Sequence, residues 1–450
     1  MRSIRPASIA SLLSVLTAAA YCILAPCLAA GSETTLPAPY LRMPDRADGA
    51  LPKLLSQTGA FKDTRRLIPA DGLIAYDLIV PFWSDGALKS RLMALPAGGK
   101  IGFSATEDWT FPNGTVFIKT FELVTDEAHP QTRRRLETRL LVRSADGHVY
   151  GVLYKWRADG SDADLLTTEA REDIPIKAAD GRVRRQIWYY PSRKDCLSCH
   201  NEHTTGVLGP KARQLDCDLA LKSGVSVNQL IEWSSLGLFT TPVTDSELPS
   251  IPRLAAGDDT TRTLEDRARS YLDANCAHCH RPGGTVADFD ARYSTPLSEQ
   301  KIVNGPVLID QGIDRPRVVS PRDIWRSIAY MRVNTNGDIR MPPLARQTID
   351  ERGVELLKAW IESLPGKDVL APPRISPETG TFAGPVTVTL TEPEPGAEIR
   401  YTLDGSVPTA SDTLYDKPIT LTGPTVVQAR AFKDGFTRSI ISQAVLIVGQ

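Results

Sequence analysis

One short pattern, Cys-x-x-Cys-His, occurs twice in this chain and constrains it more than any other feature. The copies occupy residues 196–200 and 276–280. Two cysteines three positions apart lie on the same side of one helical turn, and the histidine follows directly. Each copy therefore predicts a turn whose three reactive side chains can hold a single chemical group, and the fold must leave room for two such groups.

The remaining cysteines add weight to this pattern. The chain has seven cysteines; Cys22 and Cys27 lie in an apolar N-terminal segment, and Cys217 alone is left between the two copies. Residues 1–30 begin with arginines, continue without charge and end in small residues, which predicts a cleaved signal peptide. A membrane anchor is the alternative, because the apolar run approaches spanning length. An exported chain with this cysteine usage employs its thiols for a cofactor.

The chemistry of the pattern points to haem. Each thiol can add to a haem vinyl group, and the adjacent histidine can reach the iron as an axial ligand. The sequence thus predicts two covalently bound haem c groups. Zinc held between Cys-x-x-Cys pairs is the alternative, but it does not explain why a histidine follows both pairs. The predicted cofactor-binding residues of the two motifs are Cys196, Cys199, His200, Cys276, Cys279 and His280.

The surroundings of the second motif, residues 259–367, suggest a known arrangement. An amphipathic helix precedes the motif, long loops and an MPPL stretch follow it, and a second amphipathic helix closes the region. This order resembles a class I cytochrome c. The resemblance implies an all-α domain in which His280 is the proximal iron ligand and Met341 the distal one. His278, between the two cysteines, is expected at the surface or at an edge.

Capping residues mark the ends of these two helices. Thr263 is a suitable N-cap for the helix before the second motif. Thr348 and Glu351 form the pattern of a capping box, which predicts that the closing helix begins there.

The first motif, within residues 191–258, leaves its sixth iron ligand open. Gly209-Pro210 resembles the loop that accepts a hydrogen bond from the proximal histidine in class I cytochromes c. No methionine lies between Cys196 and residue 260. Three outcomes remain: the N-terminal domain supplies the ligand, a lysine such as Lys211 coordinates, or the iron is five-coordinate and open to a small molecule.

The parts outside the two motifs are expected to be β-structured. Residues 31–190 contain short alternating strands with Gly and Asn turns, typical of a sandwich or a barrel-like domain. Residues 368–450 alternate in the same way after a proline-rich boundary. The expected fold class is a multidomain α+β chain, with these parts in order: signal peptide 1–30, β-rich domain 31–190, first haem c module 191–258, all-α class I cytochrome c domain 259–367, and immunoglobulin-like β-sandwich 368–450.

Several stretches resemble known families. "PFWSDGALKSR", "WTFPNGTVFIKTF", "RARSYLDANCAHCHRPGG" and "MPPL" resemble a family of bacterial secreted dihaem c-type cytochromes over residues 40–366. Some relatives occur beside quinone-cofactor sugar dehydrogenases, which implies redox protein partners of that kind. The tail, with "YTLDGSVPTASDTLYDKPITL", resembles the chitobiase/hexosaminidase C-terminal domain. Spacer, docking and glycan-contact roles are all open for that domain.

The expected function is electron transfer. The leading hypothesis is a periplasmic or extracellular dihaem cytochrome that carries electrons from a periplasmic dehydrogenase to a downstream acceptor, with no catalytic residue assigned. The alternative is a dihaem peroxidase-like oxidoreductase with an open coordination position at the first haem. The net charge of −1 gives no basic surplus for nucleic acid. No membrane span is expected after signal cleavage.

Overall fold

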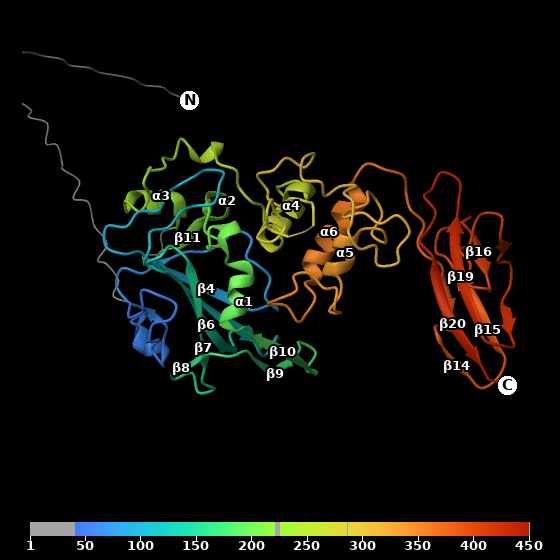
Figure 1. Ribbon diagram of the computed structural model, residues 1–450, viewed down its shortest axis with the longest axis horizontal. Coiled ribbons are helices and arrows are strands. Elements are labelled where there is room, and N and C mark those ends of the chain that lie inside the picture. The colour runs from blue at the N-terminus through green and yellow to red at the C-terminus, as the bar shows by residue number, and fades with distance from the viewer. Residues whose placement is uncertain (1–40, 221–225, 286, 450) are drawn as a thin grey trace, which may run out of the picture. The chain divides into compact units, whose positions relative to one another are not determined.

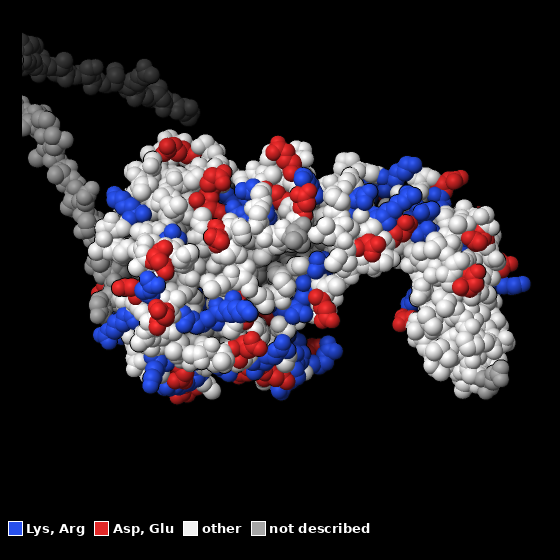
Figure 2. Space-filling model, viewed as in Figure 1, with Lys and Arg blue, Asp and Glu red and all other residues white. Residues whose placement is uncertain are grey.

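The computed structural model describes residues 41–220, 226–285 and 287–449 (Figure 1). The signal peptide expected at residues 1–30 lies outside this part of the chain. Among the described residues, no helix has both the length and the apolar character needed to cross a membrane. On the face shown in Figure 2, acidic and basic side chains are interspersed.

A six-stranded antiparallel sheet organises the N-terminal region (Figure 1). Neighbours in space are also neighbours in sequence, because short turns such as Asp146-Gly147 join consecutive strands. The strands in order are β3 (Ile74–Ala75), β4 (Leu88–Ala94), β5 (Val116–Val124), β6 (Arg133–Arg143), β7 (Val149–Trp156) and β8 (Ala163–Leu166). Smaller elements before it are η1 (Leu55–Thr58), β1 (Phe61–Asp63) and β2 (Ile68–Pro69).

The two faces of this sheet pack against different parts of the chain. One face buries Ile118, Leu140 and Val152 against the segment around Leu55. On the opposite face, the hairpin of β9 (Ala170–Lys177) and β10 (Val183–Tyr190) covers one end. The short helix α1 (Arg193–Cys199), which carries the first motif, lies against β7.

The described residues of the range 191–258 do not have a core of their own. Their elements are α1, η2 (Glu202–Thr204), α2 (Ala212–Leu215), β11 (Asp218–Ala220), β12 (Ser226–Asn228), α3 (Gln229–Ser235) and η3 (Leu248–Ser250). Leu215 and Trp233 are buried in one cluster with Trp109 and Phe117 from the N-terminal region. The segment that contains the first motif is therefore packed directly onto the β-sheet.

The expectation that residues 259–367 form an all-α class I cytochrome c domain is wrong. The described part of this region has three helices, α4 (Leu264–Asn275), α5 (Ile328–Val333) and α6 (Glu351–Ser363), and most of the rest is turn and loop. Five prolines between residues 282 and 321 explain this, because proline lacks the amide hydrogen that continues a helix. Single bridges such as Val303–Val319 hold the loops instead.

The helix caps in this region were predicted with mixed success. The N-cap at Thr263 is confirmed, since its hydroxyl oxygen accepts a hydrogen bond from the Asp266 amide, 3.0 Å away. The capping box at Thr348 is wrong: Asp350 is the N-cap of α6, and its carboxylate accepts from the Gly353 amide. A Cβ at residue 353 would come within 2.4 Å of the Tyr271 ring, so glycine permits α4 and α6 to pack closely.

The C-terminal part consists of two sheets around one core. The alternation of buried and exposed residues along β15 matches a strand with one face inward. Val388, Val427 and Leu446 are fully buried between the sheets. The three-stranded sheet has the order β13 (Arg374–Ser376), β15 (Val386–Thr391), β18 (Ile419–Leu421). The five-stranded sheet has the order β14 (Gly380–Phe382), β20 (Ser442–Val448), β19 (Thr425–Phe432), β16 (Glu398–Thr402), β17 (Thr413–Leu414).

Candidate functional site

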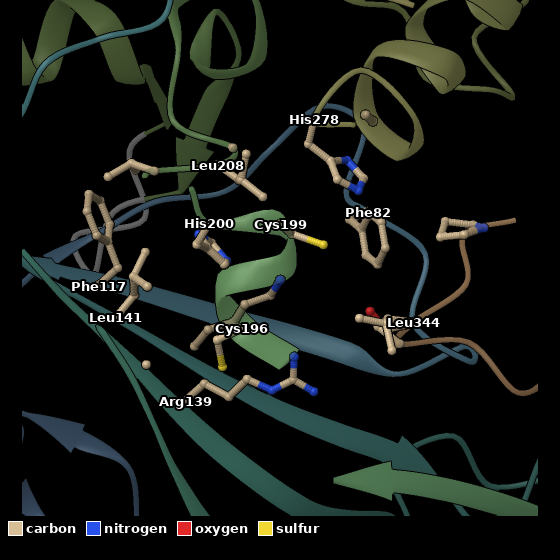
Figure 3. A pocket seen from close by; sticks show the side chains of 18 of the residues that line it. Phe82, Phe117, Arg139, Leu141, Cys196, Cys199, His200, Leu208, His278 and Leu344 are labelled. Carbon is tan, nitrogen blue, oxygen red and sulfur yellow. The ribbon is translucent and has the colours of Figure 1, made fainter. Parts of the chain in front are cut away.

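A cavity of about 320 Å³ lies beside the first motif (Figure 3). Its volume is at the lower end of the range for small-molecule sites. Several parts of the chain enclose it: α1, the face of β5 to β7, the loops before β4 and after α1, the second motif, and the loop of residues 342–345. The walls are mainly apolar, with side chains that include Leu78, Val80, Phe82, Phe117, Leu141, Val207, Leu208 and Leu344.

His200 is held in a state suited to binding a metal. Its Nδ1 lies 3.0 Å from the carbonyl oxygen of Gly206. A carbonyl can only accept, so Nδ1 carries the proton and Nε2 keeps its lone pair. Burial lowers the pKa of His200 to about 4, against the opposing effect of this hydrogen bond. The acceptor is Gly206 rather than Gly209-Pro210, and Gly209 instead forms part of the cavity wall.

The cysteines of the first motif are positioned by the start of α1 and by the sheet beneath it. The Ser192 hydroxyl and the Asp195 carboxylate form a capping box that fixes the first turn. Cys196 packs on Gly151 of β7, where a Cβ would come within 2.6 Å of the sulfur. Glycine at this position lets α1 approach the sheet. Both Cys196 and Cys199 border the cavity.

The second motif reaches the same cavity from the other side. The Sγ atoms of Cys199 and Cys279 and a ring nitrogen of His278 all lie within 4.8 Å of one another. A hydrogen bond with Cys199 lowers the pKa of Cys279. His278 is only 8% exposed and meets Phe82 edge-on, with ring centroids 5.5 Å apart (Figure 3). The expectation of a surface or edge position for His278 is therefore wrong, because the side chain is buried.

The other predicted site residues lie outside the cavity lining. Of the described residues that border the cavity, none is Cys276, His280 or Met341. The His280 ring stacks on Phe289 with centroids 4.1 Å apart, and burial lowers its pKa to about 4. Its Nδ1 is 3.5 Å from the Thr285 hydroxyl oxygen.

Met341 lies on a loop whose next residues do reach the cavity. It is half-buried, and its amide donates to the Arg332 carbonyl oxygen over 2.8 Å. Residues 342–345 line the cavity together with Cys279. The structure thus brings the MPPL stretch close to the second motif, while the Met341 side chain lies elsewhere than in this lining.

Residues 82–85 of the N-terminal region form a strap that contacts both the second motif and the loop after MPPL. The sequence patterns did not predict this role. The Trp83 amide donates to Asn275 Oδ1 over 2.8 Å, directly before the second motif. Asp85 Oδ1 accepts from the amides of Gln347 and Thr348, at 2.7 and 2.8 Å. The strap therefore ties the second motif and the loop after MPPL to the β-sheet. The signal available in the sequence was the unusual PFWSDG cluster.

Comparison with known proteins finds one family. A model described as the Chitobiase/beta-hexosaminidase C-terminal domain matches residues 377–443. No curated protein and no solved structure matches the chain. The matched residues belong to the C-terminal sandwich, and the cavity lies outside them. The expected chitobiase-type domain in the tail is thus confirmed.

Proposed function

We propose that this chain is an exported dihaem c-type cytochrome that carries electrons. The observation that supports the proposal best is the convergence of both motifs on one mainly apolar cavity, where His200 keeps an unprotonated Nε2. Haem, when bound, supplies one-electron redox chemistry. The chain supplies attachment, an axial ligand, a dry environment and a short separation between the two sites.

The residues at the two motifs are of the types that bind haem. Cys196 and Cys199 would form thioethers with the first haem, and His200 would bind its iron. The apolar walls suit a flat aromatic ring, and the Gly206 carbonyl fixes the histidine tautomer. Cys276, Cys279 and His280 would hold the second haem in the same manner. Met341 is proposed as the distal ligand of that haem.

Location and partners follow from the sequence. The charge-free segment after Arg2 and Arg5 supports export to the periplasm or beyond. The proposed partners are redox proteins, with a quinone-cofactor sugar dehydrogenase as the first to test. The chitobiase-type domain is proposed to contact a glycan or another protein.

The test is a haem count on protein produced in a bacterial host that attaches haem to Cys-x-x-Cys-His motifs. A pyridine haemochrome assay is expected to give two haems per chain. The double variants C196S/C199S and C276S/C279S are each expected to keep one haem. C217S is the matched control and is expected to keep two, because Cys217 lies outside both motifs.

A second candidate is a zinc site, which one observation favours. Cys199, Cys279 and His278 offer three ligand atoms within 4.8 Å, and three protein ligands leave the fourth position of a tetrahedral zinc open. Thioether-linked cysteines are not thiolates, so the two candidates exclude each other at these residues. One zinc and no haem per chain, measured by elemental analysis, would refute the cytochrome proposal.

A further inference from the structure

Three cations stand side by side on the sheet beneath α1. Lys119 of β5 pairs in register with Arg91 of β4 on one side and with Arg139 of β6 on the other. Directly opposed residues in neighbouring strands point to the same face. Like charges in this arrangement destabilise a sheet unless negative groups compensate them. Each of these three cations therefore needs a negative group nearby.

The two outer cations have carboxylate partners in the chain. Arg91 Nη1 lies 2.5 Å from Asp77 Oδ1. Arg139 binds Glu137 through two hydrogen bonds, of 2.6 and 3.1 Å. Both arginines are therefore neutralised by the protein itself.

The central cation has no such partner. Within the described residues, the Lys119 ammonium makes no hydrogen bond or ion pair, and its contact is with the Phe121 ring, 5.0 Å away. Lys119 is half-buried and lines the cavity together with His200 and Cys199. Burial and the nearby charges of Arg91 and Arg139 disfavour the charged form of Lys119, and the carboxylate of Glu137 opposes them only in part. An anion in the cavity would therefore stabilise the ammonium.

Lys211, which also borders the cavity, differs from Lys119 in this respect. Its Nζ lies 3.5 Å from carboxylate oxygens of both Asp108 and Asp273. Lys211 is thus already compensated. Among the described residues that line the cavity, Lys119 is therefore the lysine without a carboxylate partner.

We propose that Lys119 binds a propionate carboxylate of the haem held at the first motif. This inference rests on the proposed function, because haem is the source of the carboxylate. Pairing with Lys119 offsets the negative charge of one propionate near the iron. This favours the reduced haem, which carries one positive charge fewer than the oxidised haem.

The experiment uses the purified holoprotein, the variants K119M and K119R, and the control K155M. Lys155 faces the same side of the sheet but pairs with Glu172 at 3.0 Å and lies outside the cavity lining. Haem is counted first, and the potential of each haem is then measured by spectroelectrochemistry. K119M is expected to lower one potential while keeping its spin state, whereas K119R and K155M stay close to the wild type.

Each other outcome has a defined meaning. Unchanged or raised potentials in K119M overturn the inference. A change from low-spin to high-spin iron in K119R also overturns it, because the amine of Lys119 would then be an iron ligand. If K119M loses the first haem, K119Q is measured in place of K119M. Loss of this haem in both variants, with retention in K119R, supports the inference. Loss of this haem in all three variants overturns it. Fewer than two haems in the wild-type chain refutes the proposed function and is detected before any variant is compared.

Discussion

At the scale of single residues, Met341 is expected to set the potential of the proposed second haem. A thioether opposite histidine raises the potential, so M341A should lower it and abolish the methionine-to-iron absorption band. Optical spectra and a redox titration measure both changes. M331A is the control, since Met331 is a half-buried residue of α5. A variant M341A that keeps the band would remove Met341 from the ligand set.

Local patterns singled out the residues proposed to attach haem, but not their surroundings. His200 and its cysteines stand out because the chemistry proposed for them is contained in five consecutive residues. Gly206, His278 and Lys119 were not, since their roles depend on contacts that the sequence does not encode locally. The Lys119 position becomes informative only when the register of β4, β5 and β6 is known. A hydrogen-bond acceptor such as the Gly206 carbonyl carries no side-chain signal at all.

At the scale of elements, Glu172 of β9 anchors the β9–β10 hairpin to the main sheet. Its carboxylate accepts from the Tyr190 hydroxyl at 2.7 Å and pairs with Lys155 at 3.0 Å and with Arg134. Burial raises the pKa of Glu172, but these partners outweigh it and lower the pKa to about 2. A depressed carboxyl pKa stabilises the fold above the unfolded value of about 4.5, and this stability disappears as the pH falls towards 2.

The variant E172Q tests this anchor. It should cost about 2 kcal/mol of unfolding free energy at pH 7, after a discount for partial exposure, and much less at pH 2.5. Denaturant unfolding of both proteins at the two pH values measures the difference. E169Q is the control, because Glu169 is exposed and makes one long hydrogen bond, 3.4 Å from the Tyr189 hydroxyl. An equal loss at both pH values would show that the carboxylate charge is not responsible.

The expected helices show which features of this region sequence patterns predict and which they do not. Periodicity found α4 and α6, because both have an apolar face that is buried against the other. The long loops expected between them are present, but the all-α domain expected around them is not, because this proline- and glycine-containing stretch adds only the short helix α5. The cap of α6 was misplaced because Thr348 donates its hydroxyl hydrogen to Asp85, 3.0 Å away, which lies far earlier in the chain.

At the scale of the whole molecule, the two motifs were expected in separate modules. In the structure, the first motif shares its core with the N-terminal sheet, and the second reaches the same cavity. Domain boundaries drawn from composition separate segments that pack together, because a shared core leaves no gap in the sequence. The boundary before the C-terminal sandwich is different, since the residues of that core all come from one continuous stretch.

The C-terminal sandwich is therefore expected to fold alone. A fragment of residues 368–450 keeps the whole core and the backbone hydrogen bonds between Asp368, Leu370 and Thr437. It should give a β-type circular dichroism spectrum and a cooperative thermal transition. The complementary chain, residues 1–367, should keep both haems, because the cavity lining ends at Ala345. A shorter fragment, 383–450, is the control and should not fold, since it lacks β13 and β14, which pair with β15 and β20. An unfolded 368–450 fragment, or haem loss from 1–367, would mean that the sandwich and the cavity region stabilise each other.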